Sequence, residues 1–148
     1  MIYLVHHADA LGPELDPQRP LSMAGRAHAE RIAADAAARG VKPVAVWHSG
    51  KLRARQTADA MWRACNPAAE FAAIRGLQPN DPPDEIRARV AGETRDIMLV
   101  GHMPSLPRIF LQLLGGEGES ADTATFPQHG LVALEPIGDQ WKEKWRIE

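Results

Sequence analysis

Four polar side chains that could handle a phosphoryl group follow three short apolar segments of the sequence. They are His7, Ser49, Arg53 and His102. A neutral imidazole is a good nucleophile toward phosphorus, and its phosphorylated form hydrolyses readily, so a histidine can divide a hard displacement into two easier steps. A lone histidine at the end of a strand is more often an ordinary polar residue. The combination with an arginine therefore carries the hypothesis of a phosphate site.

Arg53 is the second part of this hypothesis. We expect it in the first turn of a helix over residues 52–64, where its charged fork would join the free amides of the helix N-terminus. Arg55 should face roughly the opposite side of that helix, as a solvated surface charge. His102 lies in a Gly-His-x-Pro turn and is predicted to donate a hydrogen bond to a phosphoryl oxygen, or to supply charge when protonated. Ser49 either binds a phosphate oxygen or only starts a turn.

Hydrophobic periodicity predicts the elements that must position these residues. Strands are predicted at 2–7, 44–48, 71–74 and 96–100, helices at 23–39, 52–64, 84–90 and from 105 onward, and a hairpin at 131–135 and 140–147. Alternating strands and helices indicate a three-layer α/β/α fold with a mostly parallel sheet and a C-terminal antiparallel hairpin. In such sheets ligands bind beyond the carboxyl ends of the strands, so the polar residues should meet at one edge.

Local signals refine the ends of these elements. Ser22, Asp84 and Ser105 are each predicted to cap the N-terminus of a helix. Gly40 is expected just past the end of the first helix. Residues 116–125 are predicted to form a mobile loop.

Length and composition set outer bounds. A chain of 148 residues is expected to be one domain, residues 1–148. Its net charge of −2 argues against nucleic acid or an anionic membrane as partner. No apolar run approaches the roughly 20 residues of a membrane span, and the N-terminus does not look like a signal peptide. Cys65 is the only cysteine, so no internal disulfide is possible, and we expect a cytoplasmic protein.

Two sequence blocks carry a resemblance to a known family. They are the Ser-x-x-x-Arg-Ala-x-Gln-Thr-Ala block at 49–58 and the Gly-His-x-Pro turn at 101–104. With the strand into His7 and the Arg-Pro-Leu-Ser segment at 19–22, they resemble the histidine phosphatase superfamily, also called phosphoglycerate mutase-like. The nearest branch is the short SixA-like phosphohistidine phosphatases, and the similarity covers nearly the whole chain.

The resemblance implies a role for each matching residue. His7 would be the phosphate-accepting nucleophile, with Arg53 and His102 as catalytic phosphate-binding partners, and Arg19 near the mouth of the pocket. It implies a phosphoglycerate mutase-like fold and a phosphatase that uses no metal and no cofactor. The substrate would be a phosphorylated protein carrying phosphohistidine, or a small phosphorylated molecule.

The sequence departs from the family at its opening motif, where His6-His7-Ala8 stands in place of Arg-His-Gly. A histidine at position 6 would bind phosphate with less charge and fewer donors, at a cost of about 2–3 kcal/mol, or roughly 30–150-fold. With an ordinary pKa near ~6.5, its charge at neutral pH would depend on the bound anion. Neighbouring strand residues point to opposite faces, so the chain must turn at His6 for both imidazoles to serve one anion. The alternative function is therefore a catalytically weakened module that binds phosphate or phosphohistidine.

Two further questions stay open in the sequence. Larger relatives use a carboxylic acid to protonate the leaving group, and Asp9, Asp81 and Asp84 are candidates here, although each is more typical of a turn or cap. A phosphohistidine substrate relaxes the need for such an acid.

A third hypothesis for the function is a metal site formed by histidines. The candidates show no recognisable ligand spacing, and they are His6, His7, His48, His102 and His129.

Overall fold

The computed structural model describes residues 1–116 and 126–148 of the chain. Residues 117–125 lie outside the described residues, and so does nearly all of the loop predicted at 116–125. No helix in the described part of the chain is both long enough and apolar enough to cross a bilayer.

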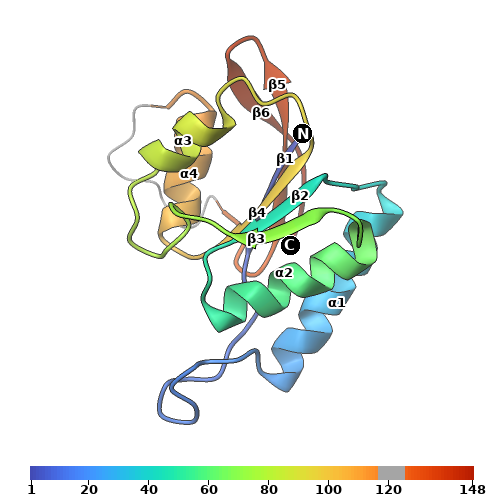
Figure 1. Cartoon of the computed structure of the whole chain (residues 1–148), viewed down its shortest axis with the longest axis vertical. Helices are drawn as coiled ribbons and strands as arrows, with labels where there is room; N and C mark the ends of the chain where they lie inside the picture. Colours follow the sequence, from blue (N-terminus) through green and yellow to red (C-terminus); the bar gives the residue numbers. More distant parts are fainter. Residues whose placement is uncertain (117–125) are drawn as a thin grey trace.

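A single six-stranded sheet organises the described residues, in the order β3-β2-β4-β1-β5-β6 (Figure 1). The strands are β1 Ile2–His6, β2 Ala45–His48, β3 Glu70–Ala73, β4 Ile97–Gly101, β5 Leu131–Ile137 and β6 Gln140–Ile147. The strands β3, β2, β4 and β1 run parallel to one another. The strands β5 and β6 form an antiparallel hairpin, and β5 pairs with β1 in the antiparallel sense. The predicted mostly parallel sheet with a terminal hairpin is confirmed.

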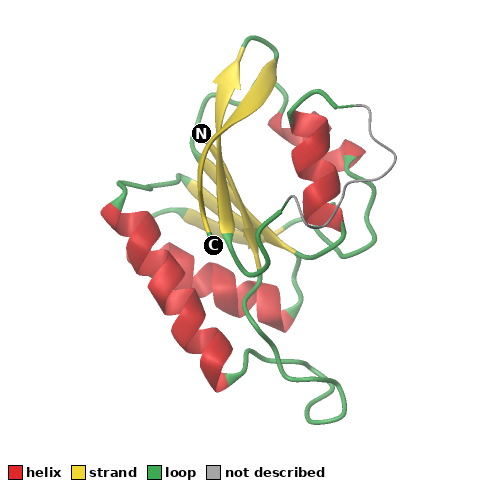
Figure 2. Ribbon diagram, turned by 180° about the vertical axis from the view of Figure 1, so that it is seen from behind, coloured by secondary structure: helices red, strands yellow, loops and turns green. Residues whose placement is uncertain are grey.

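Four helices of the described chain cover the two faces of the sheet, as Figure 2 shows. They are α1 Met23–Ala38, α2 Leu52–Cys65, α3 Asp84–Val90 and α4 Ser105–Leu113. Along β1, Ile2 and Leu4 pack in the core on the α3 and α4 side, and Tyr3 and Val5 in the core on the α1 and α2 side. Burial on both faces explains why the parallel strands read as continuous apolar runs.

Both predicted ends of the first helix are confirmed at α1. Ser22 caps the helix, with its hydroxyl oxygen accepting from the Gly25 amide at 3.0 Å. Gly40 follows the helix in the left-handed conformation, with φ of 83°. A side chain at Gly25 would overlap the backbone carbonyl of Asp9, so this glycine lets α1 approach the loop after β1.

The other two predicted caps are wrong. Pro83 and Pro104 occupy the N-cap positions, and Asp84 and Ser105 are the first residues of α3 and α4. The Ser105 hydroxyl instead donates to the carbonyl of His102 at 3.0 Å. It therefore stabilises the turn that carries a candidate catalytic residue.

Candidate active site

The carboxyl ends of three adjacent parallel strands form the site. β1 pairs with β4 so that His6 lies opposite Gly101, and β2 pairs with the other side of β4. The His7 amide extends this pairing by donating to the Gly101 carbonyl at 3.1 Å. The rings of His7 and His102 have their centroids 5.0 Å apart. The structure thus brings together residues that the sequence placed at one edge.

His7 has the protonation state that a nucleophile needs. Its Nδ1 lies 2.7 Å from the Ala8 carbonyl, which can only accept, so Nδ1 carries the proton and Nε2 carries a lone pair. Burial lowers the pKa of His7 to about 4, and the charge of Arg53 contributes to the shift. At neutral pH the ring is therefore uncharged, with Nε2 unprotonated.

His6 is held in the opposite tautomer. Its Nδ1 accepts a hydrogen bond of 2.8 Å from the His129 amide, so the neutral ring carries its proton on Nε2. The pKa of His6 is lowered to about 2, mainly by burial and to a smaller extent by the neighbouring His7. The pKa of His6 in the protein without an anion therefore lies far below the ordinary value near ~6.5. His6 is an uncharged N–H donor there.

The chain does turn where the sequence required it. The rings of His6 and His7 lie edge to face with centroids 4.5 Å apart, although the residues are adjacent. Non-glycine residues with positive φ in the described chain are Arg19 and His129, so Ala8 has a negative φ. Alanine therefore replaces the family glycine without backbone strain.

His102 is fully buried and forms a pair with Ser49. The Ser49 hydroxyl lies 2.7 Å from Nε2 of His102 and also accepts from the Lys51 amide at 3.2 Å. Nδ1 of His102 is buried and has no protein partner. The pKa of His102 is lowered to about 3, mainly by burial and to a smaller extent by His7. When Ser49 donates to Nε2, the neutral ring presents Nδ1–H as a free donor, so Ser49 can orient His102.

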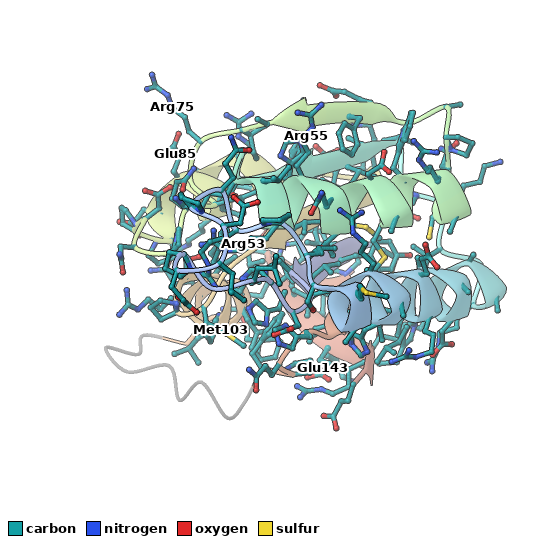
Figure 3. The ribbon with its side chains drawn as sticks, turned by 90° about the horizontal axis from the view of Figure 1, so that it is seen from below. Arg53, Arg55, Arg75, Glu85, Met103 and Glu143 are labelled. Carbon is teal, nitrogen blue, oxygen red and sulfur yellow. The ribbon has the colours of Figure 1, made fainter. Side chains whose placement is uncertain are left out.

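Arg53 supplies the permanent charge beside these neutral rings. It lies in the first turn of α2, its Nε is buried without a protein partner, and burial lowers its pKa. Arg55 is exposed, as predicted, and Figure 3 shows Arg53 and Arg55 on different sides of α2. Arg19 is near enough for its charge to lower the pKa of His7, and its Nε donates to the Leu11 carbonyl at 2.9 Å.

Two further residues of the 49–58 block tie the site together. The Ala8 amide donates to the Thr57 hydroxyl at 3.0 Å, and that hydroxyl donates to the Arg53 carbonyl at 2.9 Å. Gln56 accepts from the Leu21 amide at 2.8 Å. Helix α2 therefore fixes both the turn after His7 and the loop that carries Arg19. The sequence suggested the block, but the roles of its Gln and Thr became evident only in the structure.

His129 is a neighbour of His7 that the sequence pattern did not predict. It precedes β5 and stacks on His6 with centroids 4.7 Å apart and an interplanar angle of 8°. Its Nδ1 lies 2.6 Å from the His7 carbonyl, which can only accept, so Nδ1 donates and Nε2 is the ring nitrogen left over. Only the topology of the sheet could have predicted the position of His129. Because β5 is antiparallel to β1, it begins at the edge of the sheet where β1 ends.

The three candidate carboxylates are used elsewhere. Asp9 accepts from the Ser22 hydroxyl at 2.7 Å, Asp81 from the Gln78 amide at 3.0 Å, and Asp84 from the side chain of Gln112 at 3.2 Å. Each contact belongs to a loop or helix end. None of the three is placed by these contacts among the histidines.

The histidines suit an anion better than a metal ion. One ring nitrogen from each of His6, His7 and His129 lies within 4.8 Å of the others. However, the free ring nitrogen of His6 carries a proton, and a ligand nitrogen must not. The positive charges of Arg53 and Arg19 also oppose a cation. His48 is elsewhere, with Nδ1 accepting from the Gly50 amide.

Of three comparisons with known proteins, the one with solved structures found matches. No protein-family model matches the chain, and a search of curated proteins found no match. Among solved structures, SixA of Agrobacterium tumefaciens, designated a phosphohistidine phosphatase, is 30% identical, with a TM-score of 0.77 over 99% of this chain and 96% of that one. The protein histidine phosphatase SixA in complex with tungstate is 20% identical, with a TM-score of 0.83 over 99% and 95% of the chains.

A more distant structure shares the fold. A phosphoserine phosphatase variant from Entamoeba histolytica, bound to phosphoserine, is 13% identical, with a TM-score of 0.73 over 98% of this chain and 95% of that one. Together with the full-length match at 30% identity, this identifies the family. The chain belongs to the histidine phosphatase superfamily, also called the phosphoglycerate mutase-like superfamily.

Proposed function

We propose that this protein is a phosphohistidine phosphatase that works through a covalent phospho-His7 intermediate. One observation carries the proposal: His7, with Nε2 unprotonated, has its ring centroid 5.0 Å from that of His102 and feels the charge of Arg53, and both of these residues have a buried ring or guanidinium nitrogen without a protein partner. A neutral nucleophile next to vacant donors suits a group that brings its own negative oxygens.

The reaction would proceed in two displacements. Nε2 of His7 attacks phosphorus, and the leaving group departs with its electron pair. Arg53, His102 and the Nε2–H of His6 bind the phosphoryl oxygens during the transfer, with Arg53 supplying the charge. Water then attacks phosphorus, and the P–N electron pair returns to His7. No step requires a metal ion.

The substrate class follows from the relatives and from the site. The most similar of the structures described above is designated a phosphohistidine phosphatase, and another relative binds tungstate, an analogue of phosphate. We infer that a histidine-phosphorylated protein domain is the substrate here, with a small phosphorylated molecule as the variant. Ser49 and Arg19 are expected to assist phosphate binding, Ser49 through His102.

Mass spectrometry of the protein after exposure to a histidine-phosphorylated protein tests the covalent step. We expect phosphate on His7 and release of inorganic phosphate. His7→Ala should abolish both while its circular dichroism stays that of the parent. Turnover by His7→Ala would contradict the mechanism.

A second candidate function rests on His6. Because a neutral imidazole replaces the arginine of the family motif, the site has lost a permanent charge. A phosphate-binding module without turnover would bind tungstate or phosphohistidine but would never carry phosphate on His7. The same experiment separates the two functions.

A further inference from the structure

Within residues 1–116 and 126–148, no contact places a carboxylic acid beside His7 as proton donor for the leaving group. An alkoxide cannot depart without a proton, and larger relatives supply one from a carboxylic acid. In this chain the three carboxylates that the sequence offered are held by Ser22, by the Gln78 amide and by Gln112. Another group near His7 must act if esters with poor leaving groups are substrates.

His129 has the position that such a donor requires. A ring nitrogen of His129 lies within 4.8 Å of one of His7, and the ring is half-buried, so it borders both the nucleophile and solvent. In an in-line displacement the leaving atom lies on the far side of phosphorus from the nucleophile. A donor only a few ångströms from His7 can reach that atom directly or through one water.

The hydrogen bonds of His129 leave one ring atom free for this work. Nδ1–H is anchored on the carbonyl of His7 at 2.6 Å, and the ring is stacked on His6. The His129 carbonyl accepts from His28 at 2.9 Å, and its amide donates to His6. With its backbone and Nδ1 fixed by these contacts, Nε2 is the ring atom available to hold or take a proton.

We propose that His129 is the general acid and base of this site, an inference that rests on the proposed phosphatase function. In the first displacement the His7–phosphorus bond forms and the bond to the leaving atom breaks. His129 enters this step as the imidazolium, with Nδ1–H on the His7 carbonyl and a second proton on Nε2; the leaving atom keeps the electron pair and takes the Nε2 proton, which leaves His129 neutral. In the second, water attacks phosphorus and gives a proton back to Nε2, while the P–N pair returns to His7.

The same position serves both steps, since the attacking water approaches where the leaving group departed. The sum is one substrate and one water converted to alcohol and phosphate, with every proton accounted for. This extends the substrate class from phosphohistidine to alkyl phosphomonoesters, whose alkoxide needs an acid.

A pair of substrates of similar size separates an acid from a residue that merely shapes the site. The nitrophenolate of p-nitrophenyl phosphate departs without help, whereas the alkoxide of benzyl phosphate does not. The variant His129→Asn keeps a side-chain amide that can replace Nδ1–H, and asparagine tolerates the φ of 55° at this position. The control Gln128→Ala changes the exposed neighbour.

We expect His129→Asn to lower kcat/KM for benzyl phosphate by about 100-fold or more, the range typical of general acids. Its kcat/KM for p-nitrophenyl phosphate should stay close to that of the parent, because this constant reports only steps up to leaving-group departure. Phospho-His7 should then accumulate, since the base for the water is missing. Gln128→Ala should match the parent on both substrates.

Equal losses on the two substrates would overturn the acid role and leave only a positioning role. An unchanged rate of His129→Asn on benzyl phosphate would also overturn the acid role. So would the finding that the parent hydrolyses p-nitrophenyl phosphate but not benzyl phosphate. These results differ from failure of the proposed function, in which the parent itself never forms phospho-His7.

Discussion

Acidification from pH 7 to pH 5 should strongly destabilise this protein, through histidines that the fold keeps neutral. His6 and His102 are about 5% and 1% exposed, and burial lowers their pKa values to about 2 and about 3. In the unfolded chain both would titrate near ~6.5. Between about pH 6.5 and 3 the unfolded state therefore binds more protons than the folded state, so stability falls as pH falls.

The magnitude follows from this difference in proton binding. Each buried imidazole should cost about 2 kcal/mol of unfolding free energy between pH 7 and pH 5, so the pair costs about 4 kcal/mol, and His7, with its pKa lowered to about 4, adds about 2 kcal/mol more. Local opening around the site would reduce these values. Since small domains are stable by only about 5–15 kcal/mol, the effect should be large.

Urea unfolding at the two pH values, followed by tryptophan fluorescence and circular dichroism, measures this loss. The variant His102→Gln removes one of these imidazoles and should reduce the difference between pH 7 and pH 5 by about 2 kcal/mol. Equal stability of the parent at both pH values would refute the conclusion that the rings are buried and neutral. A variant that keeps the full difference would refute the assignment to His102.

Three other substitutions test the contacts around the site. His6→Arg should strengthen tungstate binding, measured by calorimetry. It should also lower the unfolding free energy by about 1–3 kcal/mol, because the His129 amide loses its acceptor. Unchanged stability would contradict that hydrogen bond. Gly25→Ala should destabilise by about 1–3 kcal/mol in urea, since its Cβ would overlap a backbone carbonyl; a neutral result would mean that the loop yields freely. Thr57→Val should cost about 1–3 kcal/mol by leaving the Ala8 amide unpaired, and should slow phosphorylation of the adjacent nucleophile; normal rates would show that this amide does not position it.

The fold was predictable because its signals are local. Apolar runs bounded by glycine and proline gave the strands and helices to within a few residues. The wrong caps show the limit of that approach. Asp84 and Ser105 have the side chains of good caps, but prolines with fixed φ already occupy the positions before the helices.

The clustering of the candidate residues was predictable only for those that directly follow the parallel strands in the sequence. His7, Arg53 and His102 each lie at or just beyond the end of a parallel strand, so the edge rule for α/β sheets brings them together. His129 depends on a non-local fact, the antiparallel placement of β5 beside β1. Its positive φ and its tautomer come from tertiary contacts that no short pattern encodes.

The departure at position 6 is best understood together with His129. An arginine at position 6 would have brought its own charge, whereas His6 needs an external donor to fix its tautomer, and the His129 amide provides it. The same residue then anchors its ring on the carbonyl of His7. The departure from the family motif at position 6 is thus coupled to a second imidazole beside His7. The site has exchanged a permanent charge for a hydrogen-bond donor and a group that can carry a proton.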